Sequence, residues 1–474
     1  MKISRSPPLV CPARGDYFLD VALLWRMDRM DRMDRMERRT PPAERLRARR
    51  AAVLEALGSG VMVLPAAAVQ FSSRDTDLTY RPDSELFYLT GVEEPDAVAV
   101  LSGGDPGAWT LFVAERDPDR ELWGGPRDGP EEALERFGPD ACHPLGELER
   151  RLPDLLAPAD RVYMRLGRGD LTERLVLSAL EHARARGPRT GTGPRSIVDP
   201  GEILDDLRLR KDTSEIDRIR AAARLTVEGH RAAAGAIRPG RGEWWIRAEL
   251  EAAFGRGGGV PAFGTIVGSG ANACVLHYRA SDATIADGAL VLVDAGAELG
   301  LYNGDVTRTY PASGRFIDAQ RRVYEVVEAA RAAAVAAVRP GVSIAAVHEA
   351  AVIVLTEGLV DLGVLSGGVD ESVARDAHKP YYPHQTSHWL GLDVHDPGDY
   401  VRAGTPRALE PGMVITVEPG LYFRPGGNER AEPYAGIGVR IEDDVLVTEA
   451  GHENLTLALP TAPEHIEELM DDLR

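Results

Sequence analysis

Residues 290–310 read LVLVDAGAELGLYNGDVTRTY, two runs of alternating apolar residues that flank a glycine-containing turn. This pattern predicts a β-hairpin. If the turn is centred near residues 298–300, Asp294 and Asp305 lie nearly opposite each other, with Cβ atoms ~4.5–5.5 Å apart. Two carboxylates this close repel unless a proton or a cation lies between them. The hairpin therefore indicates a metal site, although two solvated aspartates beside a turn would give the same pattern.

A second pair of acidic residues lies further along the chain, in two apolar segments. Glu418 ends the apolar run of MVITVEPGLYF, and Glu442 lies inside GIGVRIEDDVLV. An ionised side chain among aliphatic residues is costly to bury unless a counter-ion compensates for its charge. If the two segments pair as strands around the polar loop 424–435, both glutamates can face the same side as the two aspartates.

Three histidines occur close together in HQTSHWLGLDVHD, in a chain that has 11 histidines in all: His384, His388 and His395. Any one of them could be an ordinary hydrogen-bonded histidine, but we expect the cluster to serve catalysis, because neutral imidazole is a common metal ligand. Four carboxylates with one imidazole and no thiolate suit Mn²⁺, Co²⁺, Fe²⁺ or Zn²⁺. Four carboxylates also carry enough charge for two divalent ions.

The segments around this cluster predict two domains. Between residues 60 and 200, short apolar runs alternate with helical or turn-rich segments, which is typical of an α/β domain. We expect residues 184–202, rich in Gly, Pro, Thr and Ser, to be a linker. A long helix is predicted over 213–237, with Ser214 as its N-cap. Two further helices, at about 318–338 and 343–358, alternate with strand-rich stretches, so the second half is predicted to be α+β.

The beginning of the chain has a different character. Residues 27–38 read MDRMDRMDRMER, a three-residue repeat that matches neither a helix face nor a strand. We expect residues 1–39 to be a low-complexity leader without a fold of its own, either an arginine-containing arm or the product of a misassigned start codon. The first ordered helix is predicted over residues 44–57.

Composition narrows the classes of function. The chain has 474 residues, 44% hydrophobic and 27% charged, with a net charge of −19. These values describe a folded protein whose negative field disfavours binding to nucleic acid or to an anionic membrane. Its 3 cysteines form no CxxC pair, and no signal peptide or membrane span is evident. We therefore expect a cytoplasmic protein.

These motifs together carry a family resemblance. The ordered set Asp294, Asp305, His388, Glu418 and Glu442, within VDAGAELGLYNGDVTRTY, TSHWLGLDVHD, TVEPGLY and GVRIEDD, closely resembles the Xaa-Pro aminopeptidases (aminopeptidase P) of the pita-bread metallopeptidase family. DSELFYLTGVEEPDAV, NACVLHYRA and GHENLTLALP extend the resemblance over about residues 40–470. It implies a creatinase-like α/β domain over residues 40–200 and an α+β pita-bread catalytic domain over residues 201–474.

The resemblance also implies how the site is used. Two divalent ions, usually manganese, would be bridged by Asp305 and Glu442. Asp294 would bind one ion, and His388 with Glu418 would complete the coordination of the other.

Further residues match the family's catalytic and substrate positions. His395 is expected to stabilise the oxyanion, Glu418 to move a proton and His384 to support them. Three residues are expected to contact the substrate: His277, Arg440 and Phe87. Phe87, from the same or a neighbouring chain, replaces a Trp of some relatives and is expected to form an open apolar wall. Gln385 stands where the family usually has Gly.

The implied activity is release of the N-terminal residue from peptides with proline in the second position, by metal-activated water. A prolidase, which cuts only Xaa-Pro dipeptides, has the same ligands and is the main alternative. A methionine aminopeptidase would not need such an N-terminal domain, and a non-catalytic pita-bread module would typically have lost ligands. The expected partners are peptide substrates and a second copy of the chain, in a homodimer or homotetramer.

Overall fold

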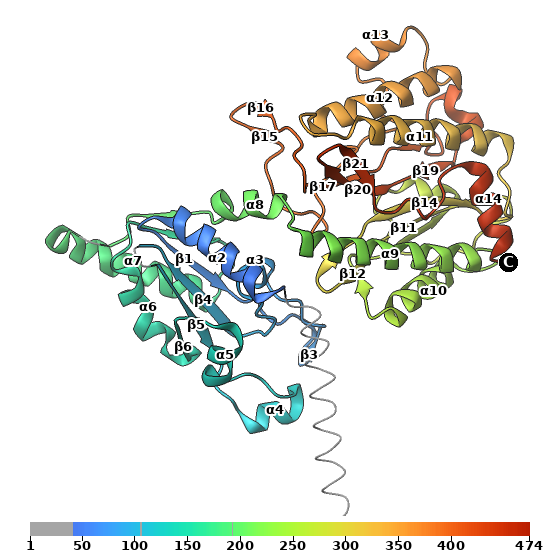
Figure 1. The fold of residues 1–474 in the computed structure, drawn as a ribbon. Coiled ribbons are helices and arrows are strands. Elements are labelled where there is room, and N and C mark those ends of the chain that lie inside the picture. Colours follow the sequence, from blue (N-terminus) through green and yellow to red (C-terminus); the bar gives the residue numbers. More distant parts are fainter. Residues whose placement is uncertain (1–40, 105–106, 192) are drawn as a thin grey trace, which may run out of the picture.

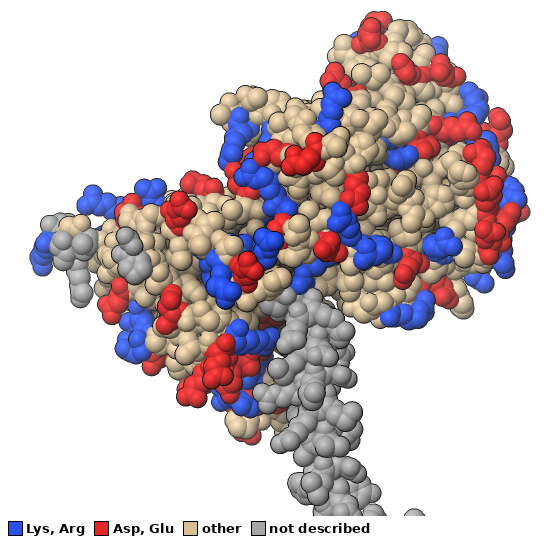
Figure 2. All heavy atoms as spheres, in the orientation of Figure 1, with Lys and Arg blue, Asp and Glu red and all other residues tan. Residues whose placement is uncertain are grey.

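The computed structural model describes residues 41–104, 107–191 and 193–474, which form two halves joined by one helix (Figure 1). The predicted leader, residues 1–39, lies outside the described residues. The two halves correspond to the predicted α/β and α+β parts of the chain. Acidic and basic side chains are interspersed over the face shown in Figure 2, with acidic groups gathered over α14 (Pro463–Asp472). Among the described helices, none has the length and apolar character needed to span a membrane.

The N-terminal half is built on a mixed six-stranded sheet. In spatial order its strands are β6 (Ala141–Pro144), β5 (Ala108–Val113), β4 (Ala97–Ser102), β1 (Val61–Pro65), β7 (Arg161–Tyr163) and β8 (Ser196–Val198). The central strand β1 pairs antiparallel with β4 and parallel with β7. Because successive side chains point to opposite faces, Met62 and Leu64 enter one hydrophobic core and Val61 and Val63 enter another.

Helices cover both faces of this sheet. α2 (Ala43–Leu57), α3 (Ser84–Thr90) and α5 (Pro130–Phe137) contribute to the core on one face, and α6 (Leu148–Leu156) and α7 (Leu171–Thr190) to the core on the other. α4 (Pro118–Gly124) and the hairpin of β2 (Phe71–Ser73) and β3 (Thr76–Asp77) lie outside these layers. The three-layer α/β prediction and the predicted helix over 44–57 are confirmed.

The segment predicted to be a linker is structured instead. The described residues of the segment 184–202 include the last turns of α7, the edge strand β8 and the first residues of α8 (Gly201–Leu209). Gly191, in the left-handed conformation, ends α7, and Pro200 is the N-cap of α8. Residue types that are typical of loops therefore occur here at the ends of helices. Helix α8 then leads into the second half.

Helix α9 (Thr213–Ala236) opens the second half, and its N-cap differs from the prediction. Asp212, and not Ser214, is the N-cap: its carboxylate accepts hydrogen bonds from the backbone N–H groups of Ser214 and Glu215. Glu215 in turn accepts from the backbone N–H of Asp212 at 3.0 Å, which completes a capping box. Asp and Ser are both common N-cap residues. The capping box with Glu215 forms at Asp212, the earlier of the two candidates.

Short strands between two helical layers form the centre of the second half. One sheet contains β10 (Ile266–Ser269), β11 (Leu290–Ala295) and β14 (Val306–Pro311), and another contains β17 (Val414–Val417), β20 (Asp443–Thr448) and β21 (Gly451–Asn454). β18 (Gly420–Tyr422) pairs with β19 (Gly438–Arg440). α9 and α10 (Glu243–Arg256) lie on one side, and α11 (Asp318–Ala337) and α12 (Ile344–Asp361) on the other (Figure 1). The two predicted helices are thus α11 and α12.

The hairpin that begins with β11 has a different register from the predicted one. β12 (Ala297–Leu299) and β13 (Tyr302–Asn303) extend it to a turn at Gly300 and Leu301, whose φ angles are 59° and 69°. The later turn places Thr307, and not Asp305, opposite Asp294. The prediction failed because a leucine rarely adopts a positive φ. Here Leu301 is buried against the core of the N-terminal half.

Candidate metal centre

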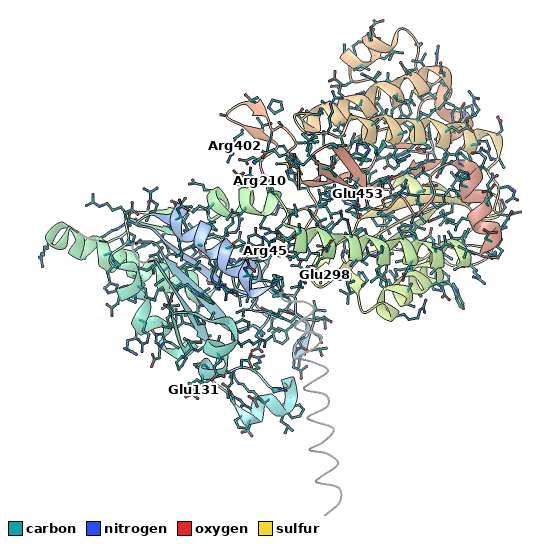
Figure 3. The ribbon with its side chains drawn as sticks, viewed as in Figure 1. Arg45, Glu131, Arg210, Glu298, Arg402 and Glu453 are labelled. Atoms are coloured by element: carbon teal, nitrogen blue, oxygen red, sulfur yellow. The ribbon has the colours of Figure 1, made fainter. Side chains whose placement is uncertain are left out.

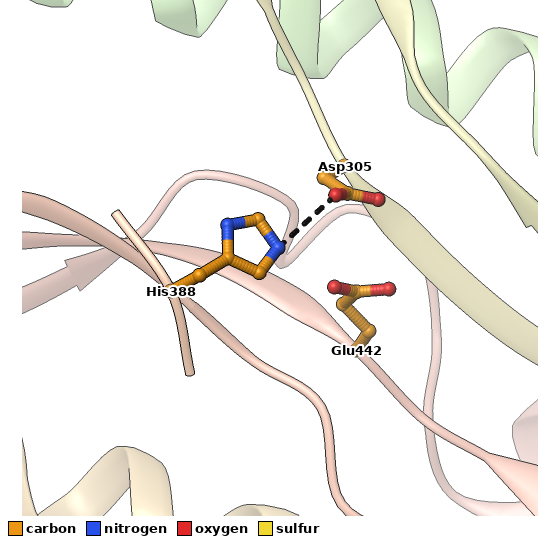
Figure 4. Close-up of side chains that lie close together, drawn as sticks. All are labelled: Asp305, His388 and Glu442. Carbon is orange, nitrogen blue, oxygen red and sulfur yellow. Dashed lines mark ion pairs between the residues drawn. The ribbon is translucent and has the colours of Figure 1, made fainter. Parts of the chain in front are cut away.

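Three of the predicted ligands form a compact group: Asp305, His388 and Glu442. Each offers one ligand atom, and these atoms all lie within 4.8 Å of one another (Figure 4). Nε2 of His388 is 3.4 Å from Oδ2 of Asp305. Asp305 immediately precedes β14, and Glu442 lies in the break between β19 and β20. The ends of separate strands thus bring together residues that are far apart in the sequence.

Glu418 lies directly after β17, as its place at the end of an apolar run predicted. Its Oε1 is 3.7 Å from Nε2 of His388, and its Oε2 is 3.6 Å from Nδ1 of His384. Its backbone N–H donates to the carbonyl oxygen of Thr386 at 2.8 Å. The glutamate therefore lies between His384 and His388, two of the four predicted histidines.

Asp294, at the end of β11, is held by a cation. Its Oδ2 accepts a 2.6 Å hydrogen bond from Nη2 of Arg440, whose side chain is buried. Its Oδ1 is buried and has no hydrogen-bond partner among the described residues. One oxygen of this carboxylate is thus fixed, and the other is available to a ligand.

Hydroxyl and backbone groups orient the remaining ligands. Thr307 donates from Oγ1 to Oε2 of Glu442 at 2.7 Å and accepts from Nε of Arg440 at 2.9 Å. The carboxylate of Asp444 accepts from the backbone N–H of Asp305. Nδ1 of His388 donates to the carbonyl oxygen of Trp389 at 3.0 Å. Nε2 is therefore the ring nitrogen that faces the carboxylates and would bind a metal ion.

Burial perturbs the protonation of the whole group. It raises the pKa of Asp305 and Glu442, and neighbouring carboxylates raise them further. It also raises the pKa of Glu418 to about 7. Burial alone would lower the pKa of His388, but Asp305 and Glu418 outweigh it and raise that pKa to about 9. The carboxylates therefore need a proton or another cation to compensate for their charge.

His384 belongs to a separate hydrogen-bond chain. Its Nδ1 donates to the carbonyl oxygen of Gln385 at 2.8 Å, so Nε2 accepts from the hydroxyl of Tyr422, also at 2.8 Å. The same hydroxyl oxygen accepts from Nη1 of Arg440 at 3.0 Å. Burial and the charge of Arg440 lower the pKa of His384 to about 3. His384 is therefore neutral. Because the Tyr422 hydroxyl oxygen accepts from Arg440, its hydrogen points to Nε2 of His384.

The other two predicted histidines lie at the accessible side of the group. The ring of His395 packs edge-on against that of His388, with centroids 4.5 Å apart and an interplanar angle of 74°. Partial burial and His388 lower the pKa of His395. His277 is exposed and close enough to contribute to the lowered pKa of both His395 and His384. The structure thus brings all the predicted histidines to one place.

Phe87 does not belong to this group. Its side chain is fully buried in the core between α2, α3 and the sheet of the N-terminal half. That position contradicts the prediction that Phe87 forms an open wall beside the substrate. The apolar segment SELFYLT is compatible with a substrate-facing wall and with a core helix. In the structure it forms the core helix α3.

Three residues that orient the ligands were not predicted from the sequence: Thr307, Tyr422 and Asp444. Thr307 and Tyr422 lie inside the quoted motifs DVTRTY and TVEPGLY, so the motifs contained them without indicating a role. Asp444 follows two other acidic residues in IEDD, and only the fold shows that it faces the backbone of Asp305. Residues that hydrogen-bond to metal ligands have no characteristic spacing in the sequence, so a sequence pattern does not reveal them.

Comparisons with known proteins agree with this geometry. The model of metallopeptidase family M24 matches residues 217–449, and that of the aminopeptidase P N-terminal domain matches residues 46–163. The Xaa-Pro aminopeptidase of Escherichia coli is 42% identical over 426 residues, 89% of this chain and 96% of that protein. The Xaa-Pro aminopeptidase of Haemophilus influenzae is 37% identical over 434 residues, 91% and 98% of the two chains.

Solved structures agree in fold as well as in sequence. Pseudomonas aeruginosa aminopeptidase PepP superposes with a TM-score of 0.88 and 43% identity, over 92% of this chain and 99% of that one. Zinc-substituted E. coli aminopeptidase P in complex with product gives a TM-score of 0.88 and 41% identity, with the same coverage.

The two domains and the carboxylate–imidazole group define a metallopeptidase with an additional N-terminal domain. Within that class, this chain belongs to the Xaa-Pro aminopeptidases of family M24. The predicted α/β plus pita-bread architecture is confirmed by the same findings.

Proposed function

We propose that the chain releases the N-terminal residue from peptides with proline in the second position, using two divalent metal ions, preferentially Mn²⁺. The observation that carries the proposal is that Asp305, Glu418 and Glu442 lie around His388, with Asp294 close enough to raise the pKa of all three carboxylates. Family membership supports the peptidase activity, and the solved zinc-substituted relative supports the use of divalent ions.

The residues present fit such ions. Oδ1 of Asp294 is buried and has no described partner, and burial raises the pKa of Asp305, Glu418 and Glu442. Oxygen donors with one imidazole nitrogen suit Mn²⁺ better than a softer metal. Divalent ions would compensate for the negative charges of these carboxylates, which otherwise need bound protons to reduce their mutual repulsion.

Each ligand has an assigned place in this proposal. Asp305 and Glu442 would bridge the ions, Asp294 would bind one, and His388 and Glu418 would bind the other. When bound, the ions would polarise the scissile carbonyl and lower the pKa of water. Arg440 and Thr307 would keep the carboxylates oriented, through the hydrogen bonds described above.

The chain's own groups would handle charge and protons during cleavage. His395 would donate a hydrogen bond to the developing oxyanion, since its ring lies beside His388 at the accessible side of the group. Glu418 would accept a proton on the carboxylate oxygen that a metal ion leaves free and deliver it to the leaving proline nitrogen. Neutral His384 and exposed His277 would line the substrate site.

Cleavage of dipeptides alone, as by a prolidase, is the second candidate. Such an enzyme needs a cationic group to capture the proline carboxylate. Arg440, which the sequence predicted to contact the substrate, is not available for this, because its buried guanidinium already contacts Asp294, Thr307 and Tyr422. This observation favours the aminopeptidase.

We also propose that the protein acts in the cytoplasm as a homodimer or homotetramer. On α4, Trp123 is 90% exposed and Leu122 is 76% exposed. Two adjacent large apolar side chains so exposed are typical of a contact surface. Light scattering on the purified protein tests the assembly, and a Trp123→Ser variant should weaken it.

The function is tested with metal-free protein reconstituted with Mn²⁺. We expect hydrolysis of Xaa-Pro-Xaa tripeptides with release of only the first residue, and none of matched Xaa-Ala-Xaa peptides. Bound metal should approach two equivalents. Hydrolysis of Xaa-Pro dipeptides alone would replace the aminopeptidase with a prolidase, and no hydrolysis of either would overturn the proposal.

A further inference from the structure

The segment that carries His395 is a compact turn. The backbone N–H of Asp396 donates to the carbonyl oxygen of Trp389 at 3.0 Å, and that of Gly391 donates to Asp393 at 3.1 Å. Asn303 of β13 donates from Nδ2 to two carbonyl oxygens of the turn, those of Gly391 at 3.1 Å and Leu392 at 3.0 Å. The backbone position of His395 therefore depends on what holds residues 389–396 in place.

A buried ion cluster, formed by Arg208, Lys211, Asp393 and Asp396, holds this turn in place. Oδ1 of Asp396 accepts from Nη2 of Arg208 at 2.6 Å, and Oδ2 accepts from Nζ of Lys211 at 3.0 Å. Nη2 of Arg208 also contacts Oδ2 of Asp393 at 2.7 Å. Arg208, Lys211 and Asp396 are only 3%, 6% and 5% exposed. Two cations and two carboxylates compensate for each other, and loss of one member leaves a buried charge unpaired.

The N-terminal half contacts the same turn. Nη2 of Arg81 donates to the carbonyl oxygen of Leu392 at 2.6 Å, and Oγ of Ser84 donates to Oδ1 of Asp393 at 2.7 Å. Arg81 also donates from Nε to Oε2 of Glu298 at 2.7 Å. Glu298 lies where the two halves meet (Figure 3). The turn is thus fixed by the N-terminal half and by the helix that joins the halves.

The ion cluster lies against the backbone of the turn at Gly391. A Cβ atom added to Gly391 would lie 2.6 Å from Oδ2 of Asp396 and 2.8 Å from Cε of Lys211. The ion pair therefore packs directly on the backbone of the turn. We therefore expect a change in the cluster to move that backbone.

We propose that Arg208, together with Arg81 and Ser84, positions His395, so that docking of the N-terminal half sets the rate of the catalytic step. The inference rests on the role proposed for His395. Arg208 and Arg81 act through the turn and are positioning residues. Small displacements of a catalytic group are costly, since a misplacement of ~1 Å can reduce the rate ~10²-fold.

The first test replaces Arg208. Arg208→Gln should lower kcat about 10- to 100-fold, with KM within about 2-fold and bound metal unchanged. Arg208→Lys should retain more activity because it keeps the charge. Arg210→Gln is the matched control: Arg210 is two residues away and pairs with Glu410 at 2.8 Å, outside the turn. It should behave as wild type.

Milder variants keep the test valid if Arg208→Gln does not fold. Arg81, whose side chain is 39% exposed, lies nearer the surface than Arg208, and the change of Ser84 to alanine removes no charge. Arg81→Gln and Ser84→Ala should each lower kcat in the same direction. In the metal-free protein, they should also raise hydrogen–deuterium exchange in peptides covering residues 389–396. Unchanged exchange and unchanged kcat in both would overturn the inference.

A double-variant cycle separates the inference from the proposed function. If Arg208 acts through His395, Arg208→Gln should lower kcat much less in a His395→Ala background than in wild type. If the double variant lost kcat by the product of the two single-variant factors, the positioning role of Arg208 would be overturned and His395 would remain catalytic. Wild-type kcat in His395→Ala alone would instead overturn the role proposed for His395.

Discussion

The carboxylate of Asp294 is divided between two environments: Oδ2 accepts a 2.6 Å hydrogen bond from Arg440, and Oδ1 is buried without a described partner. The guanidinium thus sets the direction of the free oxygen. Arg440 also contacts Thr307 and Tyr422, which reach Glu442 and His384. One buried arginine therefore orients groups on both sides of the candidate metal centre.

Arg440→Lys tests this arrangement. Lysine keeps the positive charge but presents a single ammonium group, which cannot make the same planar set of contacts. We expect kcat/KM to fall at least ~10-fold and the binding of one of two metal equivalents to weaken. Titration of metal-free protein with Mn²⁺, followed by calorimetry, measures the second effect. Two unchanged metal equivalents would show that Arg440 does not orient Asp294.

Asp305→Ala tests the metal centre itself. The change removes a carboxylate from the group formed with His388 and Glu442, so turnover should be lost and metal content should fall. Elemental analysis and peptide hydrolysis on the purified variant measure both. Asp287→Ala, in an exposed loop, should match wild type. Full activity in Asp305→Ala would exclude the dinuclear model.

His395→Ala distinguishes catalysis from metal binding. Because His395 packs on the ring of His388 and makes no hydrogen bond to a carboxylate among the described residues, we expect about two metal ions to remain bound. We expect kcat to fall ~10²–10³-fold, the typical loss for one oxyanion donor. Parallel loss of metal would make His395 a ligand instead.

Elements with strong local signals were predicted well from the sequence. α11 and α12 match the predicted helices, and Glu418 follows an apolar strand as expected. Periodic apolar positions and helix-ending Pro-Gly pairs are local, so they can be identified without a structure, although the N-cap of α9 was placed at Ser214 and not at Asp212. The ligand candidates were found for a related reason: carboxylates inside apolar strands are conspicuous.

Features that depend on distant contacts were not predicted. The turn at Gly300 and Leu301 is tolerated because Leu301 packs against the other half of the chain, and this packing changes the register around Asp294. The pair of Arg208 and Asp396 joins residues 188 positions apart. No periodicity or spacing indicates such a contact before the two halves are placed together.

Glu418→Gln tests the protonation of the metal-free centre. Burial raises the pKa of Glu418 from 4.5 to about 7 in the folded chain. The folded state then binds the proton more tightly, so this contribution to stability is full below about pH 4.5 and is lost as pH rises to about 7.

We therefore expect the Tm of metal-free wild type to fall over that window relative to Glu418→Gln, with chelator present throughout. Exposed Glu449→Gln should follow wild type. Mn²⁺ should stabilise wild type most above pH 7, because metal and protons compete for the carboxylates. Parallel Tm profiles for wild type and Glu418→Gln would contradict the raised pKa.

Phe87→Ala separates core packing from substrate binding. Because the side chain is fully buried in the core of the N-terminal half, its removal should leave a cavity and lower the free energy of unfolding by ~3–5 kcal/mol. Denaturant unfolding of the metal-loaded protein measures this loss. Below the unfolding transition, KM for Xaa-Pro-Xaa tripeptides should stay within about 2-fold of wild type, since Phe87 presents no surface to a peptide. A large rise in KM with unchanged stability would show instead that Phe87 reaches the substrate.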